Sequence, residues 1–390
     1  MTLAKSTDPS LPLRAEGRTS RAHLSVREVN TADEFQLLEN DWNRLASVVS
    51  GSVFLRHEWF SAAWAWRQTS AALQILCVYS ADRLVAVLPL LQPQRSPNGV
   101  RVVKLLTIPD TQWCDLLVDT AVTVEACAAL ADHLASTASR WDTLCLERLP
   151  PRSEAARLLM PCLEARGIVC RLAAVDCNLF IDLRGVWDKY YASRSRSVKK
   201  ACNLATNRLH RAGNPQVQQL RDTDFEDGRL QELLAELVSV SARSWKRAPQ
   251  NWLPMPGPRA FIHELSGFAL AQGVLSVWLL RLDGKAIAME YQIVKDGNVH
   301  ALRADFDETY RHLSPGTYLN RRIIEELFVA GCDRYYMGPG QNAYKGKWSD
   351  TGEPVHELTA YATTMRGRAI RLWSDLKVKL RTLRDAESFG

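Results

Sequence analysis

The sequence predicts an α/β protein, more narrowly α+β, built from two tandem units that each hold a mixed, mostly antiparallel sheet flanked by helices. Three observations predict this class. The chain has 390 residues, enough for two domains of ordinary size. Its apolar fraction of 46% and charged fraction of 24% are typical of globular proteins. One succession of elements, three strands followed by a helix and a further strand, occurs twice.

The second half of the chain carries the clearer copy of this succession. Asp283-Gly284 and Asp296-Gly297 are strong signals for tight hairpin turns between strands. Apolar residues then recur at helical spacing until Gly331, which can end a helix. The predicted order is three strands, a helix and two more strands, at 275–282, 285–294, 298–305, 317–331, 332–338 and 356–363.

The first half carries a fainter copy. Comparing 78-VYSADRLVAVLPL-90 with 280-LRLDGKAIAMEYQ-292 indicates an internal duplication with an offset of 202 residues. Helices at 187–211 and 229–247 and a proline-rich break at 249–258 separate the two copies. The three strands, the helix and the last strand of the first copy are predicted at 73–80, 83–91, 101–107, 122–137 and 142–149.

Four segments follow from this pattern: a disordered lead at 1–24, an N-terminal unit at 25–183, a C-terminal unit at 184–365, and a basic helix with a tail at 366–390. The lead lacks the apolar segment of a secretory signal, and no apolar run approaches the ~20 residues of a membrane span. The nine cysteines are odd in number and include no CxxC pair, which fits free thiols in a reducing compartment. We therefore expect a cytoplasmic protein without a metal site.

The basic charge of the chain is local. The net charge is +6, and the segment 366–384 alone holds seven Arg or Lys and one Asp, which is also +6. Because the remaining chain sums to zero, no nucleic-acid partner is expected. Around Trp373, apolar residues recur at helical spacing among the basic ones. Two interpretations stay open: a helix in peripheral contact with the inner membrane face, and a helix packed on its own domain.

The segment 310-YRHLSPGTYLN-320 joins the third strand of the second copy to its helix. Ser314 fits a helix N-cap, Pro315 fits the first helical position, and Gly316 leaves the backbone open to close approach. Such a helix start suits a phosphate, to which Arg311 would add charge, although a plain helix start is the alternative. The equivalent segment of the first copy, 108–121, has three Asp and no basic residue. An anion site is therefore expected only in the second copy.

The spacing Arg311-x-x-Ser314-Pro315-Gly316 resembles the pyrophosphate loop of the GNAT acyltransferases, Gln/Arg-x-x-Gly-x-Gly/Ala, with serine in place of the middle glycine. The segments 305-DFDETYRHLSPGTYL-319 and 337-MGPGQNAYKGKW-348 resemble signatures of the CelD/BcsL-type acetyltransferases, which are related to the FemAB transferases. The segments 54–66 and 193–213 resemble the same branch. The resemblance covers roughly residues 25–365.

This resemblance implies an N-acyltransferase that moves an acyl group from acetyl-CoA or a longer acyl-CoA to an amine. The acceptor would be a small molecule or a lipid, such as a sphingoid base, in envelope biosynthesis. Two alternatives are a FemAB-like transferase that uses aminoacyl-tRNA and an inactive scaffold that binds a membrane or a partner. The resemblance implies that coenzyme A is held by Arg311, Ser314, Pro315, Gly316 and Thr317.

Acyl transfer to an amine needs a base, a group that stabilises the oxyanion, and an acid for the leaving thiolate. Tyr344 lies where GNAT enzymes often keep that acid, and packing under the loop is its alternative role. Lys345 is predicted either to attract an anionic group or to lie solvated on the surface. Gly340 would let the backbone approach a ligand.

The base is sought on the second hairpin. A two-residue loop at Asp296-Gly297 predicts that Glu290 lies opposite Arg303, with Asp305 on the same small and polar face. Such a face could line a cleft, or Glu290 and Arg303 could simply form a cross-strand ion pair. Glu290 and Asp305 are the first candidate bases. His300 is a third candidate, expected at the edge of the core, and a chain of waters is the alternative to all three.

Overall fold

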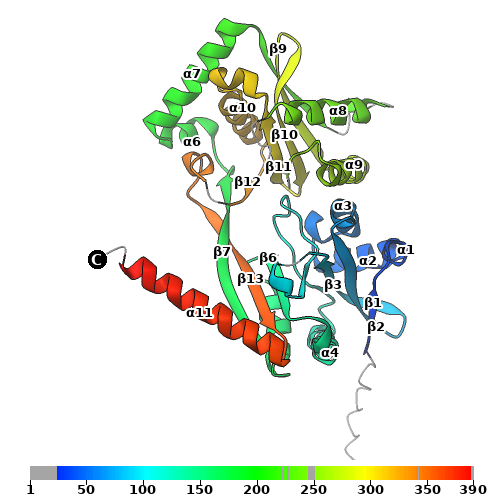
Figure 1. Cartoon of the computed structure of the whole chain (residues 1–390). Helices are drawn as coiled ribbons and strands as arrows, with labels where there is room; N and C mark the ends of the chain where they lie inside the picture. Colours follow the sequence, from blue (N-terminus) through cyan, green and yellow to red (C-terminus); the bar gives the residue numbers. More distant parts are fainter. Residues whose placement is uncertain are drawn as a thin grey trace, which may run out of the picture.

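A computed structural model gives the fold of residues 24–95, 97–221, 224–225, 228–244, 251–340 and 342–387, without the side chains of Pro97 and residues 378–387. Nearly all of the predicted lead, part of the proline-rich break, the end of the predicted helix 229–247 and the end of the tail lie outside these described residues. The chain forms two bodies, one from each half, that are joined by two long strands (Figure 1).

Thirteen strands of the described chain form one continuous mixed sheet, in the order β1-β2-β3-β4-β6-β13-β7-β12-β11-β10-β9-β8, with β5 beside β3. The predicted fold class, a mixed α/β protein with two sheet-and-helix units, is confirmed. The strands are β1 Leu24–Val29, β2 Ala71–Ser80, β3 Arg83–Pro93, β4 Val102–Leu105, β5 Leu117–Val118, β6 Thr143–Leu149, β7 Val169–Asp182, β8 Pro215–Arg221, β9 Leu275–Leu282, β10 Lys285–Lys295, β11 Asn298–Phe306, β12 Arg334–Pro339 and β13 Gly352–Tyr361.

Helices cover both faces of the sheet in the second unit. On one face α7 and α10 pack on β9, β10 and β12, and on the other α8 and α9 share a core with the first unit. The helices are α1 Ala32–Leu37, α2 Glu39–Val49, α3 His57–Arg67, α4 Thr123–Ser136, α5 Met160–Glu164, α6 Trp187–Ser193, α7 Arg196–Ala212, α8 Arg229–Ala242, α9 Pro256–Ala271, α10 Pro315–Val329 and α11 Met365–Glu387.

The strands β7 and β13 tie the two units together (Figure 1). β13 comes from the C-terminal half, yet it pairs with β6 of the first half and with β7. The far end of β7 then pairs with β12 of the second unit. The sheet therefore passes from one unit to the other without interruption. The sequence missed β7 because much of it is exposed on both faces, including Leu172 and Val175, and so shows no alternation.

Both predicted hairpin turns are present. Asp283 with Gly284 and Asp296 with Gly297 all have positive φ angles, as two-residue turns between twisted strands require. The sequence also missed β1, β8 and the helices α1, α2, α3 and α9. Each of these elements is short or has only a modest apolar face, so its sequence pattern does not distinguish it from a loop.

The predicted register of the β10–β11 hairpin holds only near the turn. Ile293 lies opposite His300, as expected, but Tyr291 rather than Glu290 lies opposite Arg303. The cause is a β-bulge at Leu302, which adds one residue to β11. Because side chains alternate with a period of two, one extra residue moves all later side chains to the other face. The expected pairing of Glu290 with Arg303 is therefore wrong, and so is the shared face with Asp305.

Candidate functional site

The loop between β11 and α10 lies where the sequence places the anion site, but its serine does not cap the helix. Ser314 has φ 59° and ψ 50°, a left-handed conformation, and its side chain makes no capping hydrogen bond. The N-cap prediction is wrong because a capping side chain needs an extended backbone. The Ser314 carbonyl instead accepts hydrogen bonds from the amides of Thr317 and Tyr318, at 3.1 and 3.2 Å. Glycine adopts the left-handed conformation of this position more easily than any other residue.

The remaining loop residues leave the helix start open. Pro315 occupies the first turn of α10 as predicted, and the Gly316 amide, near the helix start, has no acceptor within its own helix. A Cβ atom on Gly316 would lie 3.5 Å from the Phe306 ring, an ordinary contact. Arg311 is 74% exposed and pairs with Glu308 at 2.7 Å. Exposed pairs of this kind contribute about 0–1 kcal/mol, so an incoming anion could compete for the guanidinium.

A fork between β11 and β12 leads from this loop to the middle of the sheet. The two strands pair in parallel from Asn298 to His300 on β11 and from Arg334 to Tyr336 on β12, and no described pairing continues beyond. Gln112 of the first unit enters the fork and donates a hydrogen bond from Nε2 to the Ala301 carbonyl at 2.9 Å. The fork is therefore closed at His300 and opens toward the start of α10.

The loop after β12 is held by a lysine. The Lys345 ammonium donates hydrogen bonds to the carbonyls of Gly338, Pro339 and Gly340, at 2.8, 2.8 and 3.0 Å. Neither sequence-based role of Lys345, attracting an anion or lying solvated, describes these contacts. Gly340 has φ 91°, so this turn requires glycine.

Tyr344 lies beside Lys345, and its hydroxyl end points into the protein although 42% of the residue's surface is exposed. Loss of water around the hydroxyl and the negative charge of Glu290 raise the pKa of Tyr344 well above its ordinary value. A phenol in this setting stays protonated at neutral pH. It can therefore donate a hydrogen bond.

Glu290 lies in a buried polar network on the face of the sheet covered by α7 and α10. Its carboxylate accepts hydrogen bonds from the Tyr335 hydroxyl at 2.6 Å and from Gln292 Nε2 at 2.8 Å. Gln292 Oε1 in turn accepts from Trp278 Nε1 at 3.0 Å. Burial and the charge of Glu290 raise the pKa of Tyr335 well above its usual range. The structure thus brings Glu290 and Tyr344 together on one face.

Arg303, Asp305 and His300 face the opposite side of the sheet, toward α8 and the first unit. The Arg303 Nε atom lies 2.7 Å from Asp110 Oδ2, and both side chains are almost fully buried. Asp305 accepts a hydrogen bond from the Ser244 hydroxyl at 3.1 Å. The four candidate catalytic residues are therefore divided between two faces, with the fork between them.

His300 is fixed by residues that the sequence left without a role. Its ring stacks on Tyr336, with centroids 4.9 Å apart, and its Nδ1 atom lies 2.9 Å from Gln112 Oε1. The same oxygen accepts from Asn178 Nδ2 at 3.3 Å. Burial lowers the pKa of His300 to about 3, so the imidazole is neutral at pH 7. His300 does lie at the edge of the core, as expected.

The sequence missed Asp110 and Gln112 because the segment 108–121 lacks the basic loop of the second copy, and it missed Asn178 together with β7. A signal was present: Asp110, Thr111 and Gln112 form a polar run within an apolar unit. All three are buried. Buried polar side chains need partners, and Asp110 and Gln112 find theirs in the other half of the chain, whereas Thr111 accepts from the Ile108 amide of its own loop.

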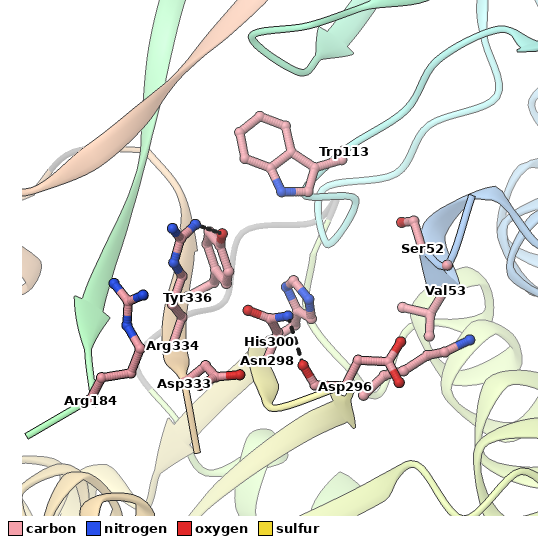
Figure 2. Close-up of a pocket in the computed structure, with 12 residues that line it drawn as sticks. Ser52, Val53, Trp113, Arg184, Asp296, Asn298, His300, Asp333, Arg334 and Tyr336 are labelled. Atoms are coloured by element: carbon pink, nitrogen blue, oxygen red, sulfur yellow. Dashed lines mark hydrogen bonds between the residues drawn. The ribbon is translucent and has the colours of Figure 1, made fainter. Parts of the chain in front are cut away.

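Two cavities lie where the units meet, and the predicted anion loop lines neither. The first, of about 540 Å³, is lined by His300 and Tyr336 from the second unit and Trp113 from the first (Figure 2). The second, of about 670 Å³, lies between α3 and the start of α9, and its charged lining residues are Arg67, Arg95 and Lys104. The first cavity adjoins the closed end of the fork.

One described group of side chains could hold a metal ion. Cys145, Glu147 and Glu357 place one ligand atom each within 4.8 Å of one another. Lys104 Nζ already lies 3.3 Å from Glu147, and its charge would oppose a cation there. Burial raises the pKa of the Cys145 thiol, which opposes formation of the thiolate that metals bind. These residues fit a local ion pair better than a metal site.

Comparison with known proteins defines the class of the second half. Residues 196–346 match the model of a family described as an acetyltransferase (GNAT) domain. This span begins at α7 and includes the fork, the loop at Ser314 and Tyr344. The chain thus carries a GNAT acetyltransferase domain, which is a transferase domain. No curated protein sequence matches the chain.

Solved structures show the same fold across both halves. FemX is 12% identical, covers 89% of this chain and 99% of its own, and has a TM-score of 0.54. L-PGS from Bacillus licheniformis is 13% identical, with coverage of 87% and 95% and a TM-score of 0.50. The C-terminal domain of a proposed lysylphosphatidylglycerol synthetase from Agrobacterium fabrum is 12% identical, with coverage of 86% and 95% and a TM-score of 0.50. The paired-unit architecture is thus shared with proteins of very different sequence.

Proposed function

We propose that this protein is an N-acyltransferase of the CelD/BcsL type that transfers an acyl group from acyl-CoA to an amine. The acetyltransferase match over residues 196–346 carries this proposal, because the span contains the loop at Ser314 and all four candidate catalytic residues. The amine nitrogen attacks the thioester carbonyl carbon, a C–N bond forms and the C–S bond breaks. The nitrogen loses one proton and the sulfur gains one, which yields an amide and free coenzyme A.

The open helix start at Ser314–Thr317 would hold the pyrophosphate, with Arg311 leaving Glu308 to pair with it. The pantetheine arm would run along the fork toward His300. Tyr344 would donate a hydrogen bond to the leaving sulfur, because its raised pKa keeps the phenol protonated. In this arrangement Glu290 holds Tyr335 in place, and the amine approaches from the face of His300 and Asp305.

The test is coenzyme A binding and thioester turnover with matched variants of Gly316. Gly316→Ala keeps the Gly/Ala pattern of the loop and makes only an ordinary contact with Phe306, so it should bind coenzyme A and turn over acyl-CoA like the wild type. Gly316→Val should lose both, because its side chain would fill the phosphate site. Arg311→Ala should weaken binding about fivefold, because an exposed charge pair contributes up to about 1 kcal/mol. Arg322→Ala, a surface pair on the same helix, is the control.

Screening acyl-CoAs of graded length by thermal shift would identify the acyl group. Normal turnover in Gly316→Val would show that coenzyme A is not held at this loop. If no acyl-CoA raises the melting temperature and no thiol is released, the chain is not an acyl-CoA enzyme, and the inactive scaffold becomes the better explanation.

A second candidate is a FemAB-like transferase that takes its acyl group from aminoacyl-tRNA. The similarity to FemX over 89% of the chain favours it. Release of coenzyme A that is insensitive to ribonuclease would exclude this candidate. Transfer that needs charged tRNA would establish it and exclude the first.

We further propose that the acceptor belongs to envelope biosynthesis, as a lipid amine or an envelope precursor. The likeness to a proposed lysylphosphatidylglycerol synthetase domain supports a lipid acceptor. None of the described helices is both long enough and apolar enough to cross a bilayer. We propose that a lipid acceptor is reached from the membrane surface and that α11 makes that contact.

A further inference from the structure

The first cavity, of about 540 Å³, lies between the two units and ends at the fork (Figure 2). Trp113 of the first unit lies on one side of the opening, and Val53 of the same unit lies beside Asp296. His300 and Tyr336 form the wall nearest the fork, and Asp296 and Asp333 lie near the β10–β11 turn, on the other side of the opening from Trp113. Neither half of the chain encloses this space alone.

The hydrogen bonds of Gln112 determine which nitrogen of His300 carries the proton. Gln112 Nε2 donates to the Ala301 carbonyl, so the other amide atom, Oε1, is an acceptor. His300 Nδ1 lies 2.9 Å from this oxygen and must therefore be the protonated nitrogen. In the neutral ring Nε2 is then a bare acceptor. Gln112 is the positioning residue, because it acts on the ring and not on a ligand.

Two carboxylates of the cavity form no close ion pair. Arg184 pairs with Asp182 and is also close enough to Asp333 for that charge to raise its pKa, and Arg334 pairs with Glu353. Across the described parts of the chain, Asp296 and Asp333 form no ion pair, and neither does Lys295. The unpaired groups of the lining thus sum to one negative charge. Asp333 lies level with Gly297, three residues before His300, and Asp296 lies in the turn itself, so the carboxylates lie about 10 Å along the strands from the imidazole.

We propose that this cavity binds the acceptor of the acyl transfer as a primary amine, with Asp296 and Asp333 drawing the ammonium group to the mouth and His300 Nε2 accepting an N–H hydrogen bond inside. That the bound amine is the acceptor rests on the proposed function. Binding of the amine itself does not depend on coenzyme A. A neutral imidazole with a fixed lone pair suits an N–H donor. The aromatic rings of Tyr336 and Trp113 suit the carbon chain next to it.

The cavity is also in the right place for the reaction. It meets the closed end of the fork at His300 and Tyr336, whereas the proposed coenzyme A loop lies at the open end. β11 spans six residues from His300 to Phe306, or about 20 Å, which separates the two sites by the length of an extended arm. An amine at His300 Nε2 and a thioester in the fork would meet at the end of that arm. Gln112 would then set both the width of the fork and the tautomer of the imidazole.

The test uses the full chain labelled with nitrogen-15 histidine, and small cations as probes. Long-range proton–nitrogen spectra should show the Nδ1–H tautomer for His300 in the wild type. Butylammonium should shift the His300 Nε2 resonance and bind about fivefold more tightly than tetramethylammonium, because only the first can donate an N–H hydrogen bond. Asp296→Asn with Asp333→Asn should weaken butylammonium binding severalfold and reduce its salt dependence. Asp188→Asn, outside the cavity, is the control.

The outcomes separate cleanly. Equal binding of the two cations, an Nε2–H tautomer, or binding of inorganic phosphate in place of ammonium would each overturn the proposal. Gln112→Glu should keep an acceptor for Nδ1 and preserve the tautomer, whereas Gln112→Ala should mix the two tautomers. The wild-type spectra decide the question even if these variants do not fold. Amine binding without coenzyme A binding would refute the proposed acyl-CoA reaction alone, and the reverse result would refute the cavity assignment alone.

Discussion

Arg303 of β11 and Asp110 of the loop before β5 form a buried ion pair that joins the two units. The nitrogen and oxygen atoms are 2.7 Å apart, and the side chains are 5% and 2% exposed. The guanidinium also donates to the Asn251 carbonyl and side-chain oxygens, and it lies 5.2 Å from the centre of the Trp66 ring. The pair therefore links β11 of the second unit directly to a loop of the first unit.

Removing one partner of this pair should be costly. Asp110→Asn leaves the Arg303 charge buried without its counterion, and we expect a loss of about 3–5 kcal/mol in the free energy of unfolding. The double variant Asp110→Leu with Arg303→Met should lose less, because no charge is left buried. Urea unfolding measures both. Asp132→Ala, which breaks an exposed pair with Arg166, is the control and should cost about 0–1 kcal/mol. If Asp110→Asn lost no more free energy of unfolding than this control, the ion pair would not hold the two units together.

The hydrogen bond from Tyr335 to Glu290 gives a second prediction. Tyr335→Phe removes a donor to a carboxylate that is only 3% exposed. We expect a loss of about 1–3 kcal/mol in the free energy of unfolding, since the buried acceptor loses part of its compensation. Glu290→Gln should lose less, because the amide oxygen can still accept from Tyr335. If the two variants unfold at the same urea concentration as the wild type, the network does not stabilise the fold.

The left-handed backbone of Ser314 gives a third prediction. A non-glycine residue in this conformation costs about 1–2 kcal/mol, and glycine gives back about 0.4–1 kcal/mol through its more flexible unfolded chain. Ser314→Gly should therefore stabilise the protein slightly and should keep coenzyme A binding. Ser314→Val should destabilise it, because a β-branched side chain fits this region poorly. Chemical unfolding of both variants checks the order. Ser314→Gly falling below the wild type would show that the serine hydroxyl has a role.

The low pKa of His300 gives a fourth prediction, on pH. The folded-state pKa of about 3 lies below the ordinary value of 6.5, so between these values the unfolded chain binds the proton more readily. The contribution of His300 to stability is thus complete above pH 6.5 and is lost as the pH falls toward 3. At pH 5 the loss is about 2 kcal/mol. His300→Gln should remove this part of the pH dependence between pH 7.5 and 5. Parallel curves for the two proteins would contradict a buried neutral imidazole.

The exposed apolar residues of α11 give a fifth prediction. Leu372, Trp373 and Leu376 are 61%, 52% and 55% exposed. If α11 contacts a membrane, the full chain should bind vesicles containing anionic lipid and not neutral vesicles. Leu372→Ser with Trp373→Ser should reduce this binding about tenfold, because two apolar side chains no longer enter the interface. Val124→Ser, an exposed apolar residue on α4, is the matched control. If the wild-type protein does not bind vesicles, the proposed membrane contact of α11 is wrong.

Local patterns predicted much of the second unit. The hairpin turns at Asp283 and Asp296, the helix after Pro315 and the strand before Gly338 all follow from residues adjacent in sequence. The same patterns predicted the loop at Ser314 as the start of a helix. The predicted pairing of Glu290 with Arg303 was wrong. A single bulge residue moves all later side chains of the strand to the other face, and the sequence pattern does not reveal where the bulge lies.

The sequence by itself determined that two sheet-and-helix units follow one another and that only the second carries a basic, glycine-containing helix start. These features depend on turn chemistry and periodicity, which act over a few residues. Only the tertiary structure decided that β13 crosses into the first unit, that Asp110 pairs with Arg303, and that Gln112 sets the tautomer of His300. Such contacts join residues 188 or more positions apart, and buried polar groups choose partners by proximity in the folded core, which local patterning does not encode.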